Sequence, residues 1–561
     1  MFPRSLKSIP LSTQVRRALG IEEEVAAMTP AELMRAILLA KVDLLWNGGI
    51  GTYVKSAVET NADVGDKAND PIRVDGGDLR SRCVGEGGNL GLTQRGRIEY
   101  ARAGGRINTD FIDNSAGVDT SDHEVNIKIL LDRVVANGDL TGKQRNDLLA
   151  SMTDEVGDLV LVDNYEQNIA LANAEAQAPG LLHVHEDWVR RLERRGLLNR
   201  DLEFLPSRKQ VAERIERKRG LTAPELAVLL AYTKIVLADE LLESDLPDDP
   251  FLRGELFSYF PSKMRHGYRP QMNDHPLRRE IIVTQIVNEL VNGAGITYFH
   301  RLSGETNASA EEITRANFLA REIYGSPALL EEISTYDNKI DAPVQTRMRI
   351  EARTLVERAS RWLLNNRRAP MDSEAVVDYF GVVTQQVMRA LPELLTGREL
   401  DAFESRRKEL VAASVPDELA TNVAVLPPAY AILGVIDTAK RDGLDPVEVA
   451  RVHFALGERL GLSILVTRIL ALPRNDRWQT MARAALRDEL HTVHAQLTAQ
   501  VLAETASGDH APRRVADWEE QDQVAVTRAV STLAEICSDD RADLARLSVG
   551  LRVVRTLLAT P

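Results

Sequence analysis

The sequence predicts an α/β segment with a parallel sheet, followed by a large all-α domain of many helices. Up to about residue 135, short apolar runs that end in glycines alternate with stretches of helical periodicity, as in strands joined by helices. From about residue 136 onward, almost every apolar stretch has helical spacing. The predicted domains are therefore residues 1–135 and residues 136–561.

The α/β segment is predicted to open with a helix and a buried strand. Residues 28–40 place Thr29 as a cap and Pro30 at the first helical position, before apolar residues at helical spacing. The next apolar run, VDLLW, is short and stops at NGGIG. A buried strand that runs into a turn has this pattern.

A second strand and its loop repeat this arrangement. SRCVGEGG predicts a brief strand followed by glycines, TQRGRIEYARA predicts a helix, and GGRINTDFIDNSAG predicts glycines, a strand and another loop. Ligands of parallel α/β sheets bind in loops at the carboxyl ends of strands. The loops at 47–52, 85–91 and 113–121 each follow a predicted strand, so we expect them on one edge of the sheet.

The remainder of the chain predicts a multi-helix domain without a fixed-period repeat. Wide apolar faces at helical spacing recur, and the stretch 507–523 is interpreted as a surface loop before a last helix. The clearest of the helical stretches are residues 222–247, 277–292, 352–364 and 450–473.

Composition argues against several classes of partner. The chain has 69 basic and 83 acidic residues, a net charge of −14, and no long basic tract, so we expect neither a nucleic-acid nor a membrane partner. No apolar run approaches the roughly 18–20 residues of a membrane span. Cys83 and Cys537 are too far apart in sequence to suggest a disulfide framework or a thiolate metal site. We therefore expect a cytoplasmic protein.

The loop GEGGNLGLT is the first candidate site. Its backbone amides, the Asn89 amide and Glu86 suit hydrogen bonding to a sugar or a carboxamide. The alternative, favoured by composition alone, is a structural turn. The dinucleotide fingerprint G-x-G-x-x-G fails here because position 90 is leucine.

A second candidate lies at VDTSDHEVNIKILL. Ser121 and Glu124 have the spacing of a capping box that opens a helix. A helix start also favours anions, so a carboxylate site is compatible with the same pattern. At such a start the protonation of His123 would be disfavoured.

Other polar clusters do not predict a metal site. The histidines of HVHED are two apart and do not share a helix face, and those of HTVH lack the glutamate and third ligand of a zinc site. The acidic loop at 63–78 misses the spacing of a calcium loop. We therefore expect no bound metal ion.

Long motifs in one order resemble the large bacterial NAD-specific glutamate dehydrogenases. The similarity is continuous over roughly residues 2–135 and extends into the helical part through 221–250 and 277–292. The resemblance implies that residues 1–135 form a Rossmann-like segment, the second half of a nucleotide-binding domain. The motifs are VDLLWNGGIGTYVKS, ADVGDKANDPIRV, VGEGGNLGLTQRGRIEYA and GGRINTDFIDNSAGVDTSDHEVNIKILL.

The small glutamate dehydrogenases supply two further likenesses. Their glutamate-glycine-alanine-asparagine loop resembles residues 86–89, and their asparagine-alanine-glycine-glycine-valine stretch ending in serine resembles 114–118 with the later Ser121. The resemblance implies that Asn89 contacts the nicotinamide ribose or carboxamide and that Asn114 faces the cofactor. It also implies that Ser121 holds the side-chain carboxylate of glutamate, and that Gly87 and Gly88 admit the nicotinamide end of NAD.

The family reaction, a step of amino-acid catabolism, oxidises L-glutamate with NAD and water to 2-oxoglutarate, ammonia and NADH. The family's catalytic lysine, acid/base aspartate and phosphate loop belong to motifs that do not occur in this sequence, so no catalytic residue is assigned here. The resemblance implies the carboxyl-terminal portion of a longer enzyme that forms homo-oligomers, and we expect this chain to be inactive alone. The alternative is a non-catalytic helical scaffold or regulatory protein derived from the enzyme.

Overall fold

The computed structural model describes residues 2–558 other than Arg4, Asn475, Ser507, Asp509, Asp539, Asp540 and Ala542. The chain divides into two compact units, Met1–Thr297 and Tyr298–Pro561. Helices dominate both units, and the few sheets are small and lie in the first unit. The predicted boundary at 135/136 falls near the end of helix α6 (Ser115–Ala136), within the first unit.

The sheets of the first unit are pairs of short strands. β1 and β2 pair antiparallel, whereas β3 pairs parallel with β6 and β4 pairs parallel with β5. Buried side chains that include Val54, Val84 and Tyr100 form the hydrophobic core beneath the two parallel pairs. The strands are β1 (Ile9–Pro10), β2 (Ala27–Met28), β3 (Leu44–Asn47), β4 (Val54–Lys55), β5 (Val74–Asp75) and β6 (Cys83–Glu86).

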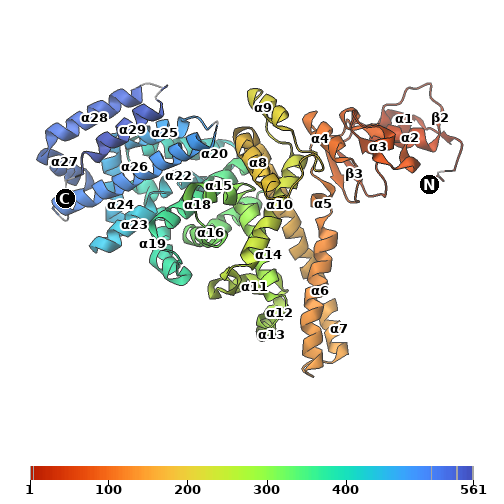
Figure 1. Cartoon of the computed structure of the whole chain (residues 1–561), viewed down its shortest axis with the longest axis horizontal. Coiled ribbons are helices and arrows are strands. Elements are labelled where there is room, and N and C mark those ends of the chain that lie inside the picture. The colour runs from red at the N-terminus through yellow and green to blue at the C-terminus, as the bar shows by residue number, and fades with distance from the viewer. Residues whose placement is uncertain are drawn as a thin grey trace. The chain divides into compact units, whose positions relative to one another are not determined.

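The helices of the first unit include long ones that carry the site described below. In Figure 1, α6 and the neighbouring α7 are drawn in orange and α8 in gold. The helices are α1 (Thr13–Leu19), α2 (Pro30–Leu38), α3 (Asn61–Val64), α4 (Gln94–Arg102), α5 (Asp110–Asp113), α6 (Ser115–Ala136), α7 (Gly142–Ala150), α8 (Thr153–Arg194), α9 (Arg208–Glu216), α10 (Ala223–Leu242), α11 (Arg253–Tyr259), α12 (Ser262–Gly267), α13 (Arg269–Asn273) and α14 (Arg278–Ala294).

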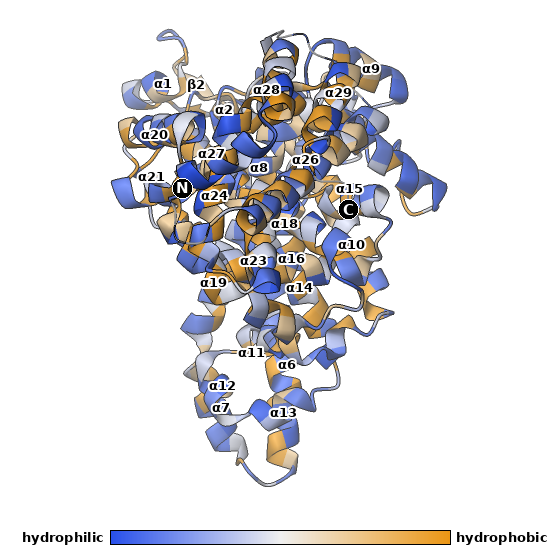
Figure 2. Ribbon diagram, turned by 90° about the vertical axis from the view of Figure 1, so that its left-hand side faces the viewer, coloured by the Kyte–Doolittle hydropathy of each residue, from blue (hydrophilic) through white to orange (hydrophobic). Residues whose placement is uncertain are grey.

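The second unit is built from helices. α16 packs on α18 and α19, and α24 packs on α23, α26 and α27. Most of these helices carry both hydrophobic and hydrophilic residues along their length (Figure 2), as expected for helices with one buried face. The helices are α15 (Tyr298–Thr306), α16 (Ala310–Tyr324), α17 (Ser326–Ser334), α18 (Ala342–Asn366), α19 (Ser373–Leu394), α20 (Gly397–Ala412), α21 (Asp417–Ala424), α22 (Leu426–Ala429), α23 (Ile432–Asp442), α24 (Pro446–Leu460), α25 (Leu462–Ala471), α26 (Arg477–Glu504), α27 (Ala511–Gln521), α28 (Gln523–Ser538) and α29 (Leu544–Arg555).

The predicted opening elements are confirmed, with one difference in burial. Thr29 and Glu32 form a reciprocal capping box at the start of α2, and Pro30 occupies its first turn. β3 forms at the apolar run, but Leu44 and Trp46 are 55% and 60% exposed. Leu44 and Trp46 alternate with half-buried residues along the strand, so they lie on one face of β3, and that face is exposed.

Two predicted loops are helical instead. The segment 104–117, predicted as a strand and a loop, contributes an isolated bridge between Arg106 and Cys83 and then forms α5. Burial of Ile112, 1% exposed, outweighs the turn-forming asparagine, serine and glycine that follow it. The segment 507–523 contains α27, whose buried Trp518 packs it into the unit; Ser507 and Asp509 lie outside the described residues.

No single helix in the described parts of the chain is both long enough and apolar enough to span a membrane. The segments Asp417–Ala429 and Ile432–Asp442, bent by 65°, meet the criteria of length and composition only when taken together.

Candidate functional site

Two of the glycine-rich loops leave the same edge of a parallel strand pair. β3 and β6 pair in a register that places Asn47 opposite Glu86, so the loops that follow these residues begin side by side. The Gly88 amide donates to the Asn47 carbonyl at 3.1 Å and joins them. The predicted placement of these two loops is confirmed.

The third predicted loop, residues 113–121, is instead the junction of helices α5 and α6, and it contacts the loop after β6. Asn114 lies between α5 and α6, and its Nδ2 donates to Oδ1 of Asn89 at 2.6 Å. Asn89 is exposed and Asn114 is half-buried. In the described structure, Nδ2 of Asn89 and Oδ1 of Asn114 have no further hydrogen-bond partner. The pair therefore leaves the NH₂ group of Asn89 to donate and the side-chain oxygen of Asn114 to accept, which complements a carboxamide.

A side chain at position 88 would meet backbone, and a side chain at position 87 would meet the Trp46 ring. A Cβ on Gly87 would lie 2.7 Å from the Trp46 ring, and a Cβ on Gly88 would lie 2.7 Å from the Gly49 carbonyl oxygen. The non-glycine Leu90 takes a φ of 59°, in the left-handed region. Such strain is held by the surroundings and concentrates at functional sites.

A buried ion network holds this loop. Arg97 of α4 donates to Glu86 with Nε at 2.6 Å and Nη2 at 3.0 Å, and its Nη2 lies 3.2 Å from Oδ2 of Asp110. Asp110 in turn accepts the Leu90 amide at 2.8 Å. Burial raises the pKa of the Glu86 carboxyl, and the Arg97 guanidinium opposes that shift. The network therefore holds the loop that follows β6 in one conformation.

Glu86 is therefore not a ligand residue, contrary to the interpretation of the loop as a sugar or carboxamide site that includes it. Its side chain is fully buried, and Oε1 also accepts the Leu92 amide at 3.1 Å. The sequence pattern could not reveal this, because Arg97 reaches Glu86 only once α4 folds back over the loop.

Asparagines of α8 position the helix junction that carries Asn114. Nδ2 of Asn164 donates to the Ile112 carbonyl at 2.8 Å and to Oγ of Ser115 at 2.9 Å. One turn further, Asn168 accepts a hydrogen bond of 2.7 Å from Asn108. Sequence reasoning missed Asn164 and Asn168, although their spacing places both on one face of a helix.

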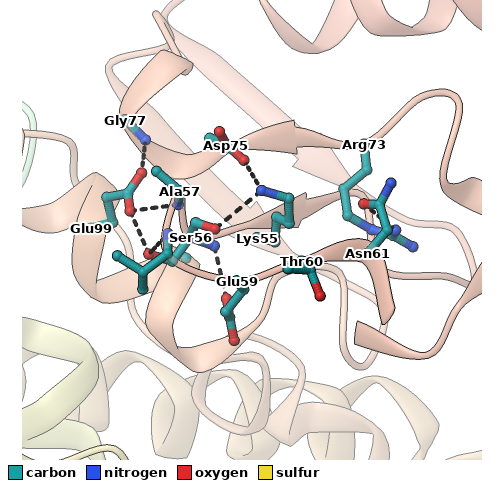
Figure 3. Close-up of polar contacts among 12 residues, drawn as sticks. Lys55, Ser56, Ala57, Glu59, Thr60, Asn61, Arg73, Asp75, Gly77 and Glu99 are labelled. Carbon is teal, nitrogen blue, oxygen red and sulfur yellow. Dashed lines mark hydrogen bonds and ion pairs between the residues drawn. The ribbon is translucent and has the colours of Figure 1, made fainter. Parts of the chain in front are cut away.

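A second polar cluster anchors the chain between β4 and α4 (Figure 3). The Glu99 carboxylate accepts the Ala57 amide at 2.9 Å, the Gly77 amide at 2.8 Å and the Ser56 hydroxyl. Lys55 pairs with Asp75 on the neighbouring strand β5. These contacts tie the segments that follow β4 and β5 to α4, whose Arg97 holds the loop.

Ser121 does not cap a helix. α6 already begins at Ser115, so Ser121 is an exposed residue of its second turn. The free backbone N–H groups of a helix lie in its first turn, before Ser121. The predicted capping box with Glu124 is wrong, because α6 runs without a break from Ser115 through Ser121, which leaves no helix start for Ser121 to cap. Burial of His123, rather than a helix start, lowers the pKa of that imidazole.

The surroundings of the two asparagines combine hydrogen-bonding groups with exposed apolar side chains. Trp46, Ile50 and Leu90 are 60%, 97% and 65% exposed and lie on or beside the two glycine loops. A flat heteroaromatic ring that carries a carboxamide could hydrogen-bond the asparagines and cover this apolar surface.

Comparisons with known proteins cover nearly the whole chain. Residues 1–174 match the family model described as "Bacterial NAD-glutamate dehydrogenase, catalytic domain", and residues 218–556 match "Glutamate dehydrogenase, C-terminal".

Three curated relatives, each named NAD-specific glutamate dehydrogenase, align with the chain. The protein of Halomonas elongata is 45% identical over 92% of this chain and 32% of its own length. The protein of Mycobacterium tuberculosis is 42% identical over 100% of this chain and 35% of its own length. The protein of Pseudomonas aeruginosa is 43% identical over 99% of this chain and 34% of its own length. The chain spans about a third of the length of these relatives.

Proposed function

Because the chain belongs to the family of bacterial NAD-specific glutamate dehydrogenases, we propose that it takes part in the NAD-dependent oxidative deamination of L-glutamate to 2-oxoglutarate and ammonia. The observation that carries this proposal is the contact between Asn89 and Asn114 at the carboxyl ends of two parallel strands. Cofactors of α/β proteins bind at that edge of the sheet.

In this proposal, residues 1–135 form the second half of a Rossmann-like nucleotide domain. Gly87 and Gly88 have no side chains, so the nicotinamide end of NAD can approach their backbone closely. Asn89 and Asn114 hold the nicotinamide carboxamide or ribose. The bound NAD accepts the hydride, and the protein supplies orientation. The buried network of Arg97 fixes the orientation of the loop before any ligand arrives.

Ser121 is proposed to contact the far carboxylate of glutamate. It lies about 10 Å along α6 from Asn114, at 1.5 Å per residue, and its exposed side chain is accessible. No catalytic residue is assigned in this chain, and homo-oligomeric assembly and a cytoplasmic location stay predictions.

Titration of NADH into the purified chain, followed by calorimetry, tests the proposed cofactor site. We expect saturable binding that Asn89→Ala and Asn114→Ala each weaken. Asn146→Ala, on the exposed face of α7, is the matched control and should bind as the unaltered chain does. Absence of saturable binding, or binding indifferent to Asn89→Ala, would contradict the cofactor site and favour the scaffold alternative.

Turnover is a separate measurement. We expect glutamate-dependent NADH formation by this chain alone to stay at background, because the family's catalytic lysine and phosphate-loop motifs do not occur in its sequence. Robust turnover would mean that catalytic residues lie in this chain.

A further inference from the structure

Three side chains that can ligate a metal converge between α6 and α8. Asp119 and His123 are one turn apart on α6, so they share a helix face, and Asp163 faces them from α8. One ligand atom from each of the three lies within 4.8 Å of the other two. Nε2 of His123 and Oδ1 of Asp119 are 3.9 Å apart.

His123 is buried without hydrogen bonds. Its side chain is 1% exposed, and neither ring nitrogen has a hydrogen-bond partner in the described structure. Leaving a buried polar atom without a hydrogen bond is unfavourable, because the atom loses its bonds to water and gains none in return. Native structures retain such groups mainly where an ion, a ligand or a function explains them.

The imidazole is held in place by stacking. Its ring lies on that of Tyr259, with centroids 4.2 Å apart and an interplanar angle of 14°. The Tyr259 hydroxyl donates to Oδ2 of Asp122 at 2.9 Å and accepts from Nδ2 of Asn126 at 2.9 Å. Because Tyr259 is fixed at its far end, the plane of His123 is set before any ligand binds.

Negative charge exceeds positive charge around the three side chains. Lys234 faces Asp119, Asp163 and Glu166 and is the cation in this group, with its Nζ bonded to Oδ1 of Asn288 at 2.8 Å. The carboxyl groups of Asp119, Asp163 and Glu166 outnumber the one ammonium group that faces them, so the cluster would attract a cation.

We propose that Asp119, His123 and Asp163 bind a divalent transition-metal ion of the Zn²⁺ class, which clamps α6 to α8. Neutral imidazole and carboxylate oxygen are both ligands of Zn²⁺, and three protein ligands leave a fourth position for water. Bonds of about 2.0–2.2 Å in tetrahedral geometry place ligand atoms roughly 3.4 Å apart. The 3.9 Å between Nε2 of His123 and Oδ1 of Asp119 is close to this spacing. Small side-chain movements would therefore bring both atoms into bonding distance of the ion.

The clamp would act next to the junction that carries Asn114. α8 already holds that junction through Asn164, and Asp163 is its neighbour in sequence. Metal binding would therefore stiffen the same pair of helices without contacting the proposed cofactor loop. The inference does not depend on the proposed function, because metal binding is measured without NAD or glutamate.

Calorimetric titration of Zn²⁺ into chain that has been dialysed against a chelator tests the site. We expect one tight site per chain, and a melting temperature that rises with Zn²⁺. His123→Gln and Asp163→Asn should each weaken Zn²⁺ binding at least tenfold and abolish the rise in melting temperature. The control His266→Gln removes an exposed histidine on α12 and should leave both readouts unchanged.

Three results would overturn the proposal: no stoichiometric Zn²⁺ binding, binding unchanged in both His123→Gln and Asp163→Asn, or stronger binding of Mg²⁺ than of Zn²⁺. Circular dichroism of the metal-free variants checks their folding. If His123→Gln does not fold, Asp163→Asn decides the question, since the amide matches the carboxylate in shape. Substitution with Co²⁺ adds a test independent of stability, because the expected visible absorption of a tetrahedral Co²⁺ site should vanish in Asp163→Asn.

Discussion

The side-chain amide of Asn114 donates to the side-chain oxygen of Asn89 at 2.6 Å and so joins the start of α6 to the loop after β6. Each residue fixes the orientation of the other. The pair therefore presents its remaining donor and acceptor as a unit, and substitutions at the two positions should not act independently.

A double-mutant cycle on NADH affinity tests this coupling. Asn89→Ala removes a proposed ligand contact and also releases the side chain of Asn114. Adding Asn114→Ala to this variant should therefore reduce the NADH affinity by less than Asn114→Ala does in the unaltered chain. We expect a coupling of about 0.5–3 kcal/mol, as for residues in direct contact. Strict additivity would show that Asn89 and Asn114 do not act together on the cofactor.

Gly88→Ala should destabilise the first unit. The added Cβ would lie 2.7 Å from the Gly49 carbonyl oxygen, a backbone atom that cannot move away by rotating a side chain. We expect a loss of about 1–3 kcal/mol in the free energy of unfolding, typical of overpacking, measured by urea denaturation. Gly157→Ala is the control, since the helical Gly157 has open space around it and alanine favours the helix. Equal stability of the two variants would refute the steric explanation.

Arg97→Met should be among the most damaging substitutions near the loop. It leaves the buried Glu86 carboxylate without its guanidinium partner, and breaking a buried pair from one side costs about 3–5 kcal/mol. The comparison is Arg82→Met, because Arg82 and Asp43 form a pair whose side chains are 83% and 87% exposed. We expect little change in that variant. Denaturant unfolding followed by circular dichroism measures both.

The second unit should lose stability as the pH falls below about 6.5. Burial lowers the pKa of His494 to about 4, and Nε2 of His494 contacts the carbonyl of the stacked His453 at 2.9 Å. An unperturbed histidine in the unfolded chain has a pKa of about 6.5. Between this pH and about pH 4, the unfolded chain binds a proton at His494 that the folded chain does not. Acid therefore favours unfolding, and full stability returns above about pH 6.5.

Unfolding free energies across this pH range should therefore fall toward acid less steeply in His494→Gln than in the unaltered chain. His510→Gln removes an exposed histidine and should leave the slope unchanged. An identical slope in all three proteins would show that His494 already titrates normally in the folded state.

Local signals in the sequence determined the elements whose causes lie within a few residues. The capping box of Thr29 and Glu32, the glycines that end β3 and β6, and the helical spacing of the later chain all predicted structure that forms. Parallel strands then sufficed to place two of the three glycine loops together. The long motifs also sufficed to identify the family, because they follow one another in the same order as in its members.

Tertiary packing decided what depends on residues far apart in the chain. The predicted third loop, residues 113–121, became the junction of α5 and α6. Packing of α4 brought Arg97 onto Glu86, so an expected ligand residue became part of the support of the loop. The cluster of His123 and Asp163 forms only where α6 meets α8. Hydrophobic burial and ion pairing act between surfaces, and no spacing within a single segment encodes which surfaces meet.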